Sequence, residues 1–129
     1  MIGMMSNYSD LFLYIVGVAM LAGYGLPLIF VPQRWARIFG WKIPEEKKLA
    51  VFLGQSLGIL LTIISAFAFF VPGSPEVKPF FFNFLLTIIG GMTLLHVYGA
   101  IRKLQPKMET WEILLWIFLF ILTLSFYPV

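Results

Sequence analysis

One histidine, His96, stands within a 22-residue segment, residues 80–101, that contains no charged side chain. Ionisable groups are costly inside an apolar helix, and where they occur in membrane segments they commonly mark functional sites. His96 has three interpretations: a structural residue bonded to another helix, an axial ligand of haem or chlorophyll, or a proton-relay residue in transport. As a structural residue it could also lie near the lipid headgroups, and in all three cases its position away from the polar face of the segment favours a subunit interface.

A second set of polar residues lies at similar depth in several apolar segments. Counted at about 1.5 Å per residue from the basic loops, these groups fall in a band about 2–10 Å deep. Helical spacing also turns them toward faces rich in small and polar residues. We therefore predict a ligand-binding pocket there, and the alternative is simple hydrogen bonding between helices. The pocket residues are Tyr24, Gln55, Tyr98 and Glu112, with Arg34 and Arg37 at the rim.

Established catalytic patterns are missing from the chain. There is no cysteine, which excludes disulfides, thiol chemistry, cysteine metal sites and iron–sulfur ligation. We find no HExxH pair, phosphate-binding glycine loop or GxSxG elbow, and no carboxylate pair with helical spacing inside an expected span. The sequence accordingly predicts no catalytic residue and no metal site, and a haem or chlorophyll would depend on His96.

Four long apolar segments must position these residues. The chain has 129 residues, of which 60% are hydrophobic and 12% charged, and its mean hydropathy is +0.94. This composition is too apolar for a soluble domain, and segments of about 20 apolar residues are long enough to cross a bilayer. We predict an all-α membrane protein, a single domain folded as a four-helix transmembrane bundle. The expected spans are residues 11–31, 49–71, 80–101 and 111–127.

A short interfacial amphipathic helix is expected after the first span, which Pro27 should bend near its end. Residues 32–48 contain five of the nine basic residues and two of the four tryptophans, a composition typical of a helix in the headgroup layer. An ordinary basic loop is the alternative. Small residues predict close helix packing within the spans. They are Gly54 and Gly58 in the second span and Gly90 and Gly91 in the third.

The charges of the connections predict an orientation. Eight of the nine basic residues lie in the first and third connections, the second connection has Lys78, and the terminal segments have none. The positive-inside rule places the two basic connections in the cytoplasm and both termini outside, and we expect a bacterial cytoplasmic membrane. Basic loops between apolar segments suit anionic lipid headgroups, so we expect lipid partners and no nucleic acid.

The order of these features resembles small four-helix bacterial membrane proteins of the DoxX-like kind. The resemblance rests on a glycine-rich first helix ending in a proline and an aromatic-basic loop, a second helix opening near GQSLG, and two further spans. It implies the fold and transfers no activity and no site; Gln55 stands where an acidic residue is often expected.

Interaction features outnumber chemical ones, so we expect an accessory or scaffold subunit that associates with other membrane subunits or with itself. The first alternative is a homo-oligomeric binder or transporter of a small hydrophobic or lipid-like molecule. The second is a haem- or chlorophyll-binding subunit that uses His96. Enzyme activity is left open, with no residue pattern in its favour.

Overall fold

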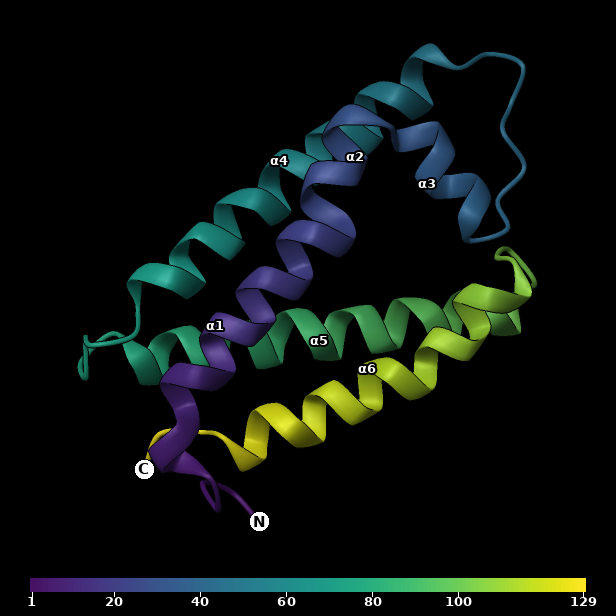
Figure 1. The fold of residues 1–129 in the computed structure, drawn as a ribbon. Coiled ribbons are helices and arrows are strands. Elements are labelled where there is room, and N and C mark those ends of the chain that lie inside the picture. The colour runs from purple at the N-terminus through teal and green to yellow at the C-terminus, as the bar shows by residue number, and fades with distance from the viewer. The chain divides into compact units, whose positions relative to one another are not determined.

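The computed structural model describes residues 1–129 and contains helices and turns but no strand. Figure 1 shows the helices in chain order. They are the 3₁₀ turn η1 (Ser6–Tyr8), α1 (Ser9–Met20), the π-helical turn η2 (Leu21–Gly25), α2 (Leu26–Phe30), α3 (Pro32–Ile38), α4 (Lys48–Phe70), α5 (Lys78–Ile101) and α6 (Lys107–Ser125).

Four helical stretches are long and apolar enough to cross a membrane, which indicates an integral membrane protein. They are Ser6–Phe30, Lys48–Phe70, Lys78–Ile101 and Lys107–Ser125. This confirms the prediction of an all-α chain with four such helices. The predicted start of the fourth helix, residue 111, is wrong. Pro106 has an extended backbone (φ −62°, ψ 161°), so α6 begins directly after it, at Lys107.

The chain divides into two compact units. The first, which we call the α4 unit, is Leu13–Phe70. The second, which we call the hairpin unit, consists of Met1–Phe12 together with Val71–Val129.

In the α4 unit, small residues let α2 and α4 approach closely. A Cβ atom built on Gly58 would lie 2.8 Å from the backbone nitrogen of Ile29 and 2.9 Å from the backbone oxygen of Gly25. A Cβ on Gly54 would lie 2.9 Å from Cβ of Pro32. Real Cβ atoms do not come this close to other heavy atoms, so both positions require glycine at this helix separation.

A π-helical turn, η2, precedes Pro27, near whose position a bend was expected. Pro27 has no N–H, so it cannot make the usual α-helical bond to the carbonyl of Gly23. Trp35 of α3 supplies a donor instead, with Nε1 2.9 Å from Gly23 O. The Trp35 ring also stacks on Phe39, with centroids 4.3 Å apart, and lies 5.5 Å from the Tyr24 ring. This hydrogen bond and these ring contacts hold α3 against η2.

In the hairpin unit, α5 and α6 pack side by side as an antiparallel pair (Figure 1). Phe82 is fully buried, and the ring of Phe12 lies 5.8 Å from it. A Cβ on Gly90 would lie 3.8 Å from the ring of Phe120, whereas one on Gly91 would meet nothing within 4 Å. Because the two helices are antiparallel, the turn between them lies at one end of the hairpin. The start of α5 and the end of α6 lie at the other end.

Candidate functional site in the α5–α6 hairpin

His96 lies on the buried face of α5, and only 4% of its surface is exposed. Its Nδ1 is 2.7 Å from the carbonyl oxygen of Met92, one turn earlier in the helix. A carbonyl oxygen can only accept a hydrogen bond, so Nδ1 carries a hydrogen and donates it. This bond orients the imidazole ring and leaves Nε2 facing α6.

Two glutamates near the start of α6 face this nitrogen. Oε2 of Glu109 is 3.0 Å from His96 Nε2, and Oε2 of Glu112 is 3.5 Å from it. Residues three apart share a helix face, and acidic side chains are favoured near a helix N-terminus by the helix dipole. One nitrogen or oxygen atom from each of the three residues lies within 4.8 Å of the other two. We call this group the His–Glu–Glu cluster.

The turn between the helices holds the two sides of the cluster in register. Gln105 Nε2 donates to the backbone oxygen of His96 at 3.0 Å and to Oγ1 of Thr110 at 3.2 Å. Gly99 makes room for this amide, because a Cβ at that position would collide with Gln105 Oε1. Gln105 thus links the last turns of α5 to the first turn of α6 beside Glu109.

Trp116 lies one helical turn beyond Glu112, on the side of the cluster away from the turn. Its ring centroid is 5.7 Å from that of His96, so the indole of this α6 residue reaches α5. The indole is close to the carboxylate of Glu112, but its buried Nε1–H has no partner with hydrogen-bond geometry. The cluster therefore has at its edge a buried donor that is not held in a well-formed hydrogen bond.

Four residues of the predicted pocket belong to the α4 unit. Tyr24 lies in the ring cluster of Trp35 described above. Gln55 Nε2 donates to the backbone oxygen of Ile29 at 3.1 Å, so its amide supports the end of α2. Arg34 and Arg37 are exposed on α3.

The other two predicted pocket residues belong to the hairpin unit. Glu112 is part of the His–Glu–Glu cluster, whereas Tyr98 is 56% exposed on another face of α5. The structure thus brings together Glu112 and His96, which the sequence analysis had treated separately. The six-residue pocket draws on both units and stays a prediction.

Glu109, Gln105 and Trp116 were missed as members of a site. The fourth helix was expected to begin at Trp111, which placed Glu109 in a loop and hid its helical spacing to Glu112. The statement that no span contains such a carboxylate pair is therefore wrong, because both glutamates lie in α6. The available signal was a Glu-x-x-Glu pair beginning directly after the proline that ends the basic turn.

Comparison with known proteins adds nothing to this geometry. No protein-family model matches the chain, and neither a curated protein nor a solved structure matches it. The resemblance to DoxX-like proteins accordingly stays a prediction, and a function must be argued from the residues of this chain.

Proposed function

We propose that this integral membrane protein binds one divalent transition-metal ion in the α5–α6 hairpin, through Nε2 of His96 and one carboxylate oxygen each of Glu109 and Glu112. The observation that supports the proposal most strongly is the approach of Nε2 to both carboxylates while Nδ1 is bonded to Met92. Imidazole nitrogen and carboxylate oxygen are common zinc ligands. A metal-binding histidine also commonly donates from its other ring nitrogen to a backbone carbonyl.

The spacing of the ligand atoms suits a small ion. Ligands about 2.0–2.1 Å from zinc in tetrahedral geometry lie about 3.3–3.4 Å from one another. The two distances from His96 Nε2 to the glutamate oxygens, 3.0 and 3.5 Å, lie on either side of this value. The two carboxylate oxygens lie within 4.8 Å of each other, so rotation of the glutamate side chains would bring the three atoms to the spacing of a small ion.

Charge balance among the three side chains also favours a divalent cation. Two carboxylates beside a neutral imidazole carry two negative charges, which one divalent ion cancels. An imidazolium ring would cancel only one of them. Net charge is costly in an apolar environment, and His96 and Glu109 are at most 9% exposed.

We further propose that the site opens toward the cytoplasm of a bacterial cell, with both chain termini outside. The turn that connects α5 and α6 carries Arg102 and Lys103, and Lys107 begins α6. Basic connections are retained on the cytoplasmic side, where they also contact anionic lipid headgroups. A metal ion would then reach His96 from the cytoplasm past this basic turn.

Calorimetric titration of the purified, metal-free protein in mild detergent tests metal binding. We expect wild-type protein to bind one Zn²⁺ per chain, and Glu109→Gln to bind it at least about tenfold more weakly, because the substitution removes an anionic ligand. Glu76→Gln is the matched control, since Glu76 is exposed between α4 and α5, and should leave the affinity unchanged. Helical wild-type protein that binds no Zn²⁺ would refute the proposal.

Haem or chlorophyll ligation through His96 would require a different arrangement of the same residues. An axial ligand needs a ring nitrogen directed at the cofactor metal. Here Nδ1 is bonded to Met92 and Nε2 faces the two glutamates. A visible absorption spectrum of natively extracted protein distinguishes this cofactor class from a colourless zinc site.

A second candidate function is that of an accessory subunit that contacts other membrane helices or a second copy of itself. Asn83, Thr87 and Tyr98 are exposed along α5, and polar side chains favour contacts between helices in lipid. Gentle extraction followed by mass measurement tests this function. A lone chain under all mild extraction conditions would contradict it.

A further inference from the structure

Three protein ligands leave a metal ion with an unfilled position. Zinc sites with three protein ligands usually hold an exchangeable fourth ligand, whereas sites with four protein ligands are closed. In the His–Glu–Glu cluster, the histidine and acidic side chains that could hold a metal ion are His96, Glu109 and Glu112. A site built on this cluster would therefore be open to one ligand from outside the protein.

The indole of Trp116 marks where this outside ligand would lie. Its buried Nε1–H lies close to the Glu112 carboxylate but makes no bond with hydrogen-bond geometry, and its ring lies 5.7 Å from that of His96. An indole nitrogen can only donate a hydrogen bond, so Trp116 is not itself a metal ligand. A buried donor without a partner is unfavourable, and an acceptor atom on the ion would satisfy it.

We propose that the metal ion exchanges its fourth ligand for small anions, and that Trp116 binds this ligand through its Nε1–H. This inference rests on the metal site proposed above. Trp116 follows Glu112 by four residues, so the donor lies on the apolar side of the cluster, away from the basic turn. Because α5 and α6 pack directly against each other, we expect a ligand of only a few atoms, such as water or a small anion.

Cobalt and azide provide the experiment, because bound Co²⁺ has visible absorption bands that change with its ligands. Wild-type protein is loaded with one Co²⁺ and titrated with sodium azide. We expect a saturable change in the bands. In Trp116→Phe, Co²⁺ should bind within about twofold of the wild-type affinity, while azide should bind about tenfold more weakly because one hydrogen bond is lost.

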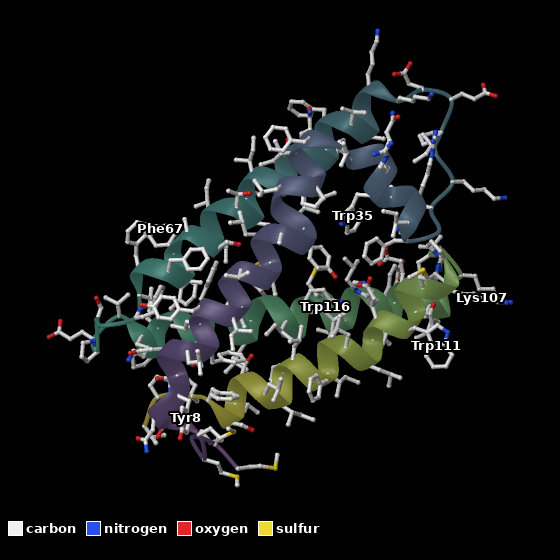
Figure 2. All side chains as sticks on the ribbon, in the orientation of Figure 1. Tyr8, Trp35, Phe67, Lys107, Trp111 and Trp116 are labelled. Atoms are coloured by element: carbon white, nitrogen blue, oxygen red, sulfur yellow. The ribbon has the colours of Figure 1, made fainter.

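Trp111→Phe is the matched control. Trp111 lies on the same helix but is 71% exposed, and Figure 2 shows it on the outer side of α6. The control should bind both Co²⁺ and azide as the wild type does. Equal azide affinity in Trp116→Phe and wild type, or no band change with azide, would overturn the inference while leaving the metal site intact. Failure of wild-type protein to bind Co²⁺ would instead overturn the metal site and this inference with it.

A second measurement follows the wild-type protein itself and uses variants only to assign one resonance. In the zinc-loaded, ¹⁵N-labelled protein, formation of a new hydrogen bond should move one indole N–H resonance downfield when azide is added. This resonance should be the one that is missing from the spectrum of Trp116→Phe. If that variant does not fold, the resonance can be assigned in a protein in which Trp111 and the other two tryptophans are replaced, where it is the only indole signal left. An unmoved Trp116 resonance during azide binding would refute its role.

Discussion

Gly99→Ala should lower the stability of the hairpin unit because it displaces the side chain of Gln105, although alanine is a better helix former than glycine. A Cβ at Gly99 would collide with the side-chain oxygen of Gln105, and this amide donates to His96 O and Thr110 Oγ1. The Gln105 side chain can rotate away, so the steric cost itself is small. The main cost is the loss of both hydrogen bonds, which in membrane proteins are worth about 0.6–1.7 kcal/mol each.

Gly91→Ala on the same helix isolates this cost. A Cβ there would meet nothing within 4 Å, so the variant should show only the gain of about 0.8–1.0 kcal/mol from helix propensity. Gly99→Ala receives the same gain and loses the two bonds of Gln105. We therefore expect it to be about 1–3 kcal/mol less stable than Gly91→Ala.

Reversible unfolding in mixed detergent micelles, followed by circular dichroism, measures the difference. The Gln105→Ala background completes a double-mutant cycle, since without the amide the alanine at position 99 should cost nothing. The reasoning would be refuted if Gly99→Ala matched Gly91→Ala in stability. It would also be refuted if its penalty persisted in full after Gln105 had been removed.

Two further substitutions test the α4 unit by the same unfolding assay. Trp35→Phe keeps a ring beside Phe39 but removes the donor to Gly23 O, and should lower the free energy of unfolding by about 1–3 kcal/mol; wild-type stability would contradict the role of that bond. Gly58→Ala should lower the free energy of unfolding by about 1–3 kcal/mol, because the new methyl group would meet backbone atoms of Ile29 and Gly25 that cannot rotate away. An unchanged midpoint of the unfolding transition would contradict the close packing of α2 and α4.

The helices were predictable because hydropathy and length alone define them. Each apolar segment of about 20 residues must satisfy its own backbone bonds, so helix follows directly from composition. The short helix after Pro32 was also expected, and α3 forms there. An irregularity near Pro27 followed from its missing N–H, but sequence spacing shows neither the π-helical turn before it nor the bond from Trp35 to Gly23 O.

The candidate site was only partly predictable, because it depends on how one turn is built. His96 and Glu112 were both recognised, but helical periodicity gives the face of a residue within its own helix and not the register between two helices. That register depends on the five-residue turn and on the bonds of Gln105 across it. An error of four residues in the start of α6 was enough to remove Glu109 from consideration.

The other polar side chains of the spans clarify why the His–Glu–Glu cluster is the place to look for function. Gln55 and Trp35 each donate to a backbone oxygen near a break in the first helix. The hydroxyl groups that donate to the carbonyl four residues earlier in their own helix belong to Ser56, Thr62, Ser65, Thr87, Thr93, Thr123 and Ser125.

These groups are polar but uncharged, and each is satisfied locally at little cost. Glu109 and Glu112 are different, because each must be neutralised by a proton or balanced by a positive charge when it is buried. Replacing the cluster by well-packed apolar residues would be expected to preserve or increase stability. Stability therefore does not account for two carboxylates opposite one imidazole in the hairpin, and this is why we propose that they bind a cation.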